Sequence, residues 1–200
     1  MNALKSLAVA TAFFLFVCAG AGAQEDAAPF GLKWMVSSDD ITALGVELTP
    51  VELPGFGDSF TAAKLPKALS DIETVVLSFG YNDQLWRVAA ISSDFENDKY
   101  GSRAKARFSE LDTSLSKSYK TGESFQRTPT DSYFSEPENF AYALSQNEAF
   151  WYSTYSSPVA TIELSLDSNH YDTFWRLIYS HIAGEKEFEA GKSDAELDAL

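Results

Sequence analysis

Three carboxylates at alternate positions form the strongest metal-binding pattern in the chain, namely Asp94, Glu96 and Asp98. Alternating acidic residues resemble the first half of an EF-hand loop, in which oxygen ligands surround a calcium ion. The second half does not follow, because Lys99 stands where the loop needs glycine and Lys105 where it needs a bidentate glutamate. The sequence therefore predicts no metal site, and a solvated turn in which Asp98 helps to cap the following helix.

The chain has two histidines, His170 and His181. His170 lies between Asp167 and Asp172, and two carboxylates beside an imidazole could hold zinc or act as acid and base. Turns also select Asp, Asn and Ser, so a solvated turn accounts for the same residues. We expect the turn, with both histidines on or beside the last strand.

Motifs for covalent catalysis and for nucleotide binding are absent from the sequence. The one cysteine is Cys18, and no serine lies in a Gly-x-Ser-x-Gly turn. The glycines are scattered and form neither a dinucleotide fingerprint nor a phosphate-binding loop. The sequence predicts no catalytic residue and no cofactor, and therefore a protein that is not an enzyme.

Aromatic residues gather on two neighbouring segments near the C-terminus. Strand alternation places Trp151 and Tyr155 on the face opposite Phe150 and Tyr152, so one set packs under helices and the other needs a different partner. Tyrosine and tryptophan are frequent anchors of protein interfaces, although ordinary core packing accounts for the same residues. The predicted contact residues are Trp151, Tyr155, Tyr171, Trp175 and Tyr179.

The chain is strongly acidic, with 29 Asp and Glu against 15 Lys and Arg, for a net charge of −14. A surface of this sign repels nucleic acid and anionic lipid headgroups, which argues against both as partners. It attracts a basic protein, although solubility alone also explains acidic composition. The partner most consistent with the charge is another protein, with basic surface.

Hydrophobic periodicity predicts the elements of the first part of the chain. Residues 30–36 and 46–53 read as strands, and Ser37 with Asp40 resembles a capping box that opens a short helix. Alternation over 72–81 and 85–93 predicts a hairpin. Apolar residues at steps of three and four predict a helix over 101–119, with one buried stripe. That stripe comprises Ala104, Phe108, Leu111, Leu115 and Tyr119.

The second part of the chain begins with a polar stretch, 121–135, which carries Pro129 and reads as an irregular loop. Ser135 with Glu138 resembles a second capping box, before a helix that ends near Ser145, and Ser193 with Glu196 a third. Residues 150–155, 159–167 and 171–182 read as three strands, the last of them central in the sheet. Their short connections require an antiparallel meander. The predicted fold class is α+β, an antiparallel β-meander sheet with helices packed on one face.

The N-terminus has the features of an export signal. Lys5 supplies a positive charge, residues 8–18 are apolar, and Ala21, Gly22 and Ala23 suit a peptidase. We therefore predict a signal peptide over residues 1–23, one α+β domain over 24–183 and a charged C-terminal tail over 184–200. The predicted location is periplasmic or secreted, without a membrane span after signal removal; a lipid anchor at Cys18 is the alternative.

Residues 35–45, from Met35-Val36-Ser37 through Asp39-Asp40-Ile41 to Leu44-Gly45, resemble the opening of small exported bacterial domains. These are the SmpA/OmlA type and the β-lactamase-inhibitor-like repeats, in which a helix pair precedes a β-meander. The resemblance implies an envelope protein that binds another protein and performs no catalysis.

Composition, signal and resemblance together favour an exported, non-catalytic binding protein. We expect an inhibitor or accessory factor of a basic envelope protein. Two alternatives remain open from the sequence. One is an envelope hydrolase that uses a pair of separated carboxylates, and the other is a structural component of an envelope assembly that docks through the tail.

Overall fold

The computed structural model describes residues 26–130 and 133–198, so the predicted signal peptide and Cys18 lie outside the described residues. The strands are β1 (Glu47–Val51), β2 (Asp58–Ala63), β3 (Ile72–Phe79), β4 (Leu85–Ser92), β5 (Lys120–Arg127), β6 (Phe150–Ser156), β7 (Ala160–Asn169) and β8 (Asp172–His181). The helices are η1 (Pro29–Gly31), α1 (Ser38–Ala43), α2 (Ser102–Ser118), η2 (Tyr133–Ser135), η3 (Pro137–Asn139), α3 (Phe140–Ser145) and α4 (Ile182–Asp198).

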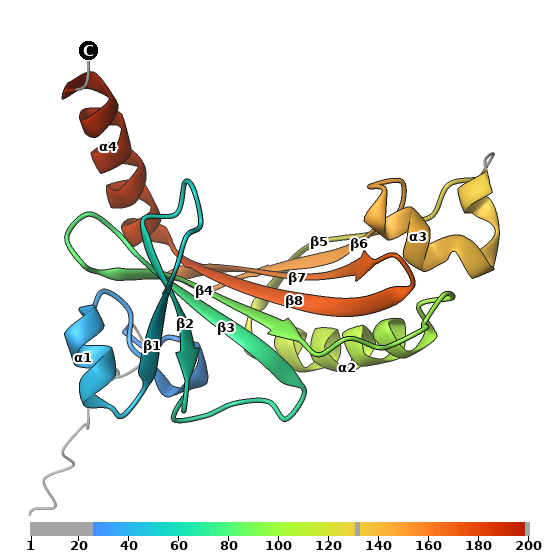
Figure 1. The fold of residues 1–200 in the computed structure, drawn as a ribbon, viewed down its shortest axis with the longest axis horizontal. Coiled ribbons are helices and arrows are strands. Elements are labelled where there is room, and N and C mark those ends of the chain that lie inside the picture. Colours follow the sequence, from blue (N-terminus) through green and yellow to red (C-terminus); the bar gives the residue numbers. More distant parts are fainter. Residues whose placement is uncertain (1–25, 131–132, 199–200) are drawn as a thin grey trace, which may run out of the picture.

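All eight strands form one antiparallel sheet in the order β1-β2-β3-β4-β8-β7-β6-β5. Two meanders, β1–β4 and β5–β8, therefore lie side by side, joined where β4 pairs with β8 (Figure 1). The α+β class and the antiparallel meander are confirmed, and so is the central position of β8. β5 and β1 are left as the two outer edges of the sheet.

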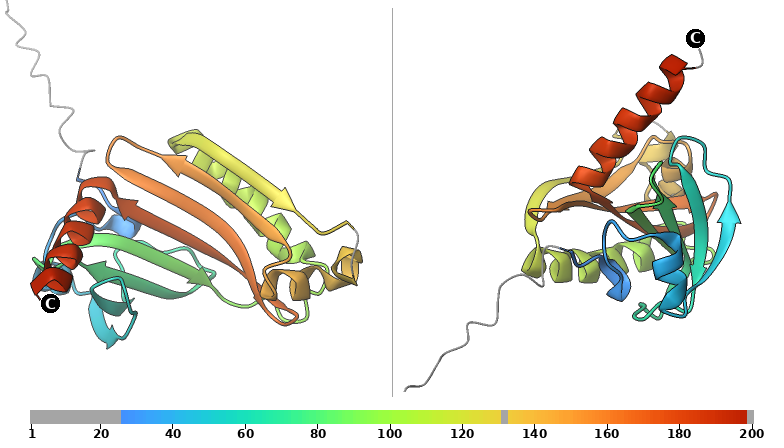
Figure 2. Two further views of the ribbon diagram at one scale, coloured as in Figure 1. Left: turned by 90° about the horizontal axis from the view of Figure 1, so that it is seen from above. Right: turned by 90° about the vertical axis from the view of Figure 1, so that its left-hand side faces the viewer.

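Helix α2 connects β4 to β5 and crosses beneath the strands that separate them (Figure 2). Its stripe of Ala104, Phe108, Leu111 and Leu115 is buried, as the spacing predicts, and α2 contacts β6, β7 and β8. The stripe, the sheet face above it and the N-terminal segment form one continuous core. Helix α3 packs on β7, whereas α4 rises on the opposite side of the sheet from α2 (Figure 2).

Residues 30–36 do not form the strand that their apolar run predicts. Leu32 and Trp34 are buried in the core, but Phe30 and Met35 take left-handed backbone angles that interrupt an extended chain. The segment is held by a bridge between Ala27 and Lys33, by hydrogen bonds to the start of β4, and by one from the Lys67 N–H to the Phe30 carbonyl. The apolar residues anchor a coiled lead-in to α1, and not a strand of the sheet.

The stretch predicted as an irregular loop, 121–135, is in its first half the edge strand β5. All eight residues of β5 are exposed, so the buried face that makes a strand visible in a sequence is missing. Pairing with β6 fixes its conformation, and the Thr154 hydroxyl bridges the irregularity in this pairing by bonding the N–H and C=O of Glu123. A partner about 30 residues along the chain, and not local propensity, makes this segment a strand.

Only the first of the three predicted capping boxes forms. The Ser37 hydroxyl accepts from the N–H of Asp40, whose carboxylate accepts from Ser37 in return. The box at Ser135 is wrong, because α3 begins after Asn139 with no side-chain cap. The box at Ser193 is also wrong, because Ser193 lies inside α4.

The C-terminal tail is a helix that begins at Ile182 and is docked on the sheet by an aromatic stack. Phe188 stacks on Trp86 at 4.9 Å and on Tyr81 at 5.6 Å between ring centroids. Gly184 lies one turn before Phe188 on the same side, and a Cβ there would be 2.7 Å from Trp86 Cβ. The other sides of this part of the helix carry exposed charged residues, which is why the sequence reads as a solvated tail; they are Glu185, Lys186, Glu187 and Glu189.

Replacing Gly184 with leucine should undock α4, because the backbone at this position lies against Trp86 with no room for a side chain. Lys186 and Lys192 lie on α4 and report on undocking through trypsin cleavage. We expect cleavage in α4 to accelerate about tenfold or more. Ala190, exposed on the same helix, is the matched control: Ala190→Leu should cleave at the wild-type rate, and equal rates for both variants would contradict this docking mode.

Candidate functional site

The two faces of the sheet differ, and we call them the core face and the open face. Registers and alternation place Val88, Leu164, Leu177 and Tyr179 on the core face, which α2 covers. The open face is turned away from α2 and is seen from above in Figure 2. Its side chains across β3 to β8 include Val76, Ala89, Phe125, Phe150, Tyr152, Glu163, Ser165, Phe174, Arg176 and Ile178.

Three of the five predicted contact residues are buried on the core face. Trp175 is 0 % exposed, Tyr155 2 % and Tyr179 7 %. Burial, followed by the hydrogen bond to Asp112, raises the pKa of Tyr155, and burial likewise raises the pKa of Tyr179. These side chains hold α2 on the sheet and have no surface to offer a partner while the domain is folded.

The other two predicted contact residues lie toward the α3 end. Trp151 is half-buried, on the core face, and makes an edge contact with Phe140 at 5.6 Å between centroids. Tyr171 is exposed in the β7–β8 turn beneath the Lys99 ammonium. The structure therefore does not bring the five residues together into one accessible surface. Alternation separates the two sets of aromatics as predicted, but the predicted contact residues Trp151 and Tyr155 belong to the set that packs under the helices, so the prediction of the contact face is wrong.

An accessible aromatic cluster lies on the open face, at the β5–β6 edge. Phe125 is 42 % exposed and Phe150 40 %, and their centroids lie 6.4 Å apart. Tyr152 completes the cluster at 5.7 Å from Phe125. We call these three residues the edge cluster. Phe125 is not among the predicted contact residues, because the polar sequence around it predicts a loop and not a strand.

Charged groups lie beside the edge cluster along the middle of the open face. Arg176 pairs with Asp167 at 3.3 Å, and Glu163 is exposed on the same face. Burial, and then the nearby Arg176, lower the pKa of Arg87, which stacks on Phe56 at 4.3 Å. This part of the face carries both signs of charge, so it is not the uniformly acidic surface that the composition suggests.

The acidic patterns singled out in the sequence hold turns and helix ends. Asp98 is buried, and its carboxylate accepts from the N–H groups of Arg103 and Ala104 and from the Thr173 hydroxyl, as a cap of α2 should. Asp172 accepts from the N–H of Asn97 at 2.7 Å. Within residues 26–130 and 133–198, no three His, Cys, Asp or Glu side chains are placed to hold a metal ion.

The two histidines have different surroundings. His170 is exposed in the β7–β8 turn with a left-handed backbone. His181 stacks on Trp34, and its Nδ1 accepts from the N–H of Gly184 at 3.0 Å, which caps the start of α4. Burial lowers the pKa of His181 and so favours the neutral ring that this bond needs. Among the residues that the structure describes, neither imidazole makes a hydrogen bond to a serine hydroxyl or to a carboxylate.

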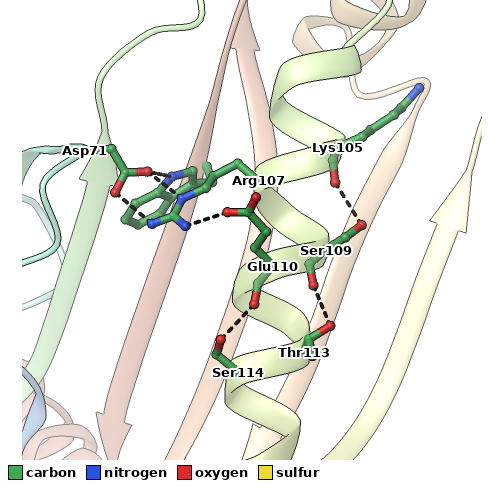
Figure 3. A network of polar contacts seen from close by, with 8 residues as sticks. Asp71, Lys105, Arg107, Ser109, Glu110, Thr113 and Ser114 are labelled. Carbon is green, nitrogen blue, oxygen red and sulfur yellow. Dashed lines mark hydrogen bonds and ion pairs between the residues drawn. The ribbon is translucent and has the colours of Figure 1, made fainter.

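Asp71 joins three elements at the side of the core (Figure 3). Its carboxylate accepts from Arg107 Nε at 2.7 Å and Nη2 at 3.0 Å, and from Trp175 Nε1 at 3.1 Å. Burial raises the pKa of Asp71, but the hydrogen bonds from Arg107 and Trp175 and the charge of Arg107 outweigh it, so the pKa lies below its usual 3.8. The surroundings of this carboxylate favour its ionised form. That form suits a structural contact that links the start of β3 to α2 and β8, which we call the Asp71 pin, and does not suit the general acid of a hydrolase.

Asp71→Asn should remove about 1–3 kcal/mol of stability at pH 7, the range for hydrogen bonds to charged groups. Because the folded pKa is depressed, this contribution is fully present above the unfolded value near 3.8 and is lost as pH falls through the folded pKa. Urea midpoints from pH 7 to about pH 2 should therefore show the gap between wild type and variant closing below about pH 4. A difference in urea midpoint that stays constant with pH would contradict a stabilising role of the ionised carboxylate. The control is Asp94→Asn at an exposed position, which should show no such pH-dependent difference.

Basic residues are concentrated on one side of the molecule. Nearly half of the lysines and arginines lie on α2, on β5 or just before α2, and these two elements are neighbours at one edge of the structure (Figure 2). The acidic excess therefore belongs to the rest of the chain. The basic residues of this side are Lys99, Arg103, Lys105, Arg107, Lys117, Lys120 and Arg127.

None of the helices within the described part of the chain is both long and apolar enough to cross a membrane. Downstream of the motif that resembles the SmpA/OmlA type, α1 leads directly into β1 without a second helix. Comparison of the chain with protein-family models, with curated proteins and with solved structures gives no significant match.

Proposed function

We propose that this protein is exported and acts as a non-catalytic binding protein, with the open face at the β5–β6 edge as its contact surface. The observation that carries the proposal is the edge cluster. Two phenylalanines exposed by about two-fifths, with Tyr152 beside them on one face of the sheet, form a contiguous apolar patch of the kind that a protein partner covers. The opposite face of the same strands is closed by α2, so the sheet holds the cluster in a fixed geometry.

The surroundings of the cluster suit a protein partner. Arg127 and Glu123 flank Phe125 on an exposed strand, which provides an apolar centre with a charged rim, as in protein interfaces. The net charge of the chain favours a basic envelope protein as partner through long-range attraction, whereas the β5 side itself carries Lys120 and Arg127. The signal-like N-terminus favours an envelope location.

Site-specific photo-crosslinking tests this proposal. A benzophenone side chain is placed at Phe150 in the edge cluster and, as the matched control, at Tyr100, which is 53 % exposed outside the cluster. Both proteins are expressed in the source cell and irradiated. We expect a discrete adduct with a different protein from position 150 and none from position 100. Adducts of the same pattern from both positions, or none from position 150, would contradict the proposed contact surface.

A further inference from the structure

The two outer edges of the sheet differ in their capacity to pair with another strand. β1 contains Pro50, which lacks an N–H and interrupts a ladder, and it is the kind of edge that resists further pairing. β5 has no proline between Lys120 and Arg127, and all of its residues are exposed. An unblocked edge strand presents alternate backbone N–H and C=O groups that no neighbour satisfies. β5 is therefore the edge at which the sheet can be extended.

The side chains of β5 are self-complementary about one position. Phe125 and Arg127 pair with Tyr152 and Phe150 of β6. Glu123, at the irregularity of this pairing, bonds the Thr154 hydroxyl through its N–H and C=O, so the three residues lie opposite alternate positions of β6. If a second β5 pairs antiparallel with Phe125 opposite the second copy's Phe125, Glu123 of each copy lies opposite Arg127 of the other. Opposite charges and aromatic pairs are the favourable cross-strand combinations.

Glu123 and Arg127 are free to make these pairs. None of the ion pairs among the described residues involves either side chain, and both residues are exposed. The paired segment in this register is residues 123–127 of each copy. The remaining charged residue of the strand, Lys120, lies outside this segment and opposite the second copy's Thr130. The pairing thus brings no two like charges directly opposite each other.

We propose that two copies of this chain associate through their β5 strands, in antiparallel register centred on Phe125. The interface is isologous, so each copy contributes the same residues and the assembly closes at two copies. One sheet then runs through both copies. Because strand pairing uses the edge and leaves the faces free, the two edge clusters meet across the axis on a shared open face.

This inference rests on the proposed function and extends it, because the contact surface would then be formed by the edge clusters of two copies together. The occupant of the β5 edge is the second copy and not an extended segment of another protein, since the Glu123–Phe125–Arg127 pattern matches itself. An edge strand alone makes a modest interface, so we expect a concentration-dependent dimer with a dissociation constant on the order of micromolar.

The test measures solution mass by sedimentation equilibrium or light scattering of the purified protein from about 1 to 200 μM. The wild type should rise from one toward two chain masses over this range. Glu123→Arg and Arg127→Glu each place like charges opposite each other twice, and each should weaken association about tenfold or more. The control Lys120→Glu changes a charge of the same strand outside the paired segment and should leave association unchanged.

Two restorations make the register specific. An equal mixture of the Glu123→Arg and Arg127→Glu proteins should form a mixed dimer, because every facing pair is again opposite in charge. The double variant E123R/R127E should pair with itself like the wild type. One chain mass at every concentration, single variants that associate like the wild type, or a mixture that stays monomeric would each overturn the proposal. These measurements use the purified protein alone, so failure of the dimer would not contradict the proposed contact surface for another protein. The crosslinking experiment tests that surface separately.

Discussion

Trp175→Ala should destabilise the domain by about 3–5 kcal/mol, the largest effect we expect from a single substitution. The indole is fully buried at the centre of β8 between the sheet and α2, so alanine leaves a cavity in the core. It also removes the Nε1 donor to Asp71, which weakens the pin between the β3 lead-in and α2. The free energy of unfolding of a domain of this size is about 5–15 kcal/mol, so the variant should retain only part of the wild-type value.

Urea unfolding followed by circular dichroism measures this effect, because it does not depend on Trp175 fluorescence. Tyr171→Ala is the matched control: Tyr171 is exposed in the turn next to β8, and its removal should cost less than about 1 kcal/mol. The pair also separates the two roles that the sequence allowed for these aromatics. If the Trp175→Ala protein had wild-type stability but altered partner binding, the result would contradict the core role of Trp175 and support its predicted role as a contact residue.

Asp98→Ala should cost about 3 kcal/mol, because it removes the cap of α2 and the bond to β8 together. The carboxylate accepts from two N–H groups in the first turn of α2 and from the Thr173 hydroxyl at 2.9 Å. Alanine leaves these donors without their acceptor at a buried position. Asp98→Asn keeps an acceptor of the same size and should recover more than half of the loss.

Asp94→Ala is the control for Asp98→Ala, because Asp94 belongs to the same acidic pattern but is exposed. We expect a change of less than about 0.5 kcal/mol for it in urea unfolding. Calcium at about 1 mM should leave the wild-type melting temperature unchanged, since the Asp98 oxygens already accept from the protein. A rise in melting temperature with calcium that disappears in Asp98→Ala would instead show that the three acids bind the ion.

The elements that the sequence predicts correctly are those whose signal is local. The stripe on α2 needs only the 3.6-residue period, and the box of Ser37 with Asp40 needs only four consecutive residues. The hairpin β3–β4 and the meander β6–β8 follow from alternation and short turns. In each case the interaction that stabilises the element joins residues that are close in the chain.

The elements that the sequence alone left undetermined depend on partners far along the chain. β5 is polar and fully exposed, so only its ladder with β6 makes it a strand. The sequence of α4 predicts a charged tail, and only the contacts of Phe188 and Gly184 with Trp86, about 100 residues earlier in the chain, dock it on the sheet. The candidate site depends on the same kind of contact. Alternation separates Trp151 and Tyr155 from Phe150 and Tyr152, but the face that α2 covers is decided by the path of the chain from β4 to β5. Burial of the α2 stripe selects that face, because the apolar surface of the helix must be removed from water against the most apolar side of the sheet.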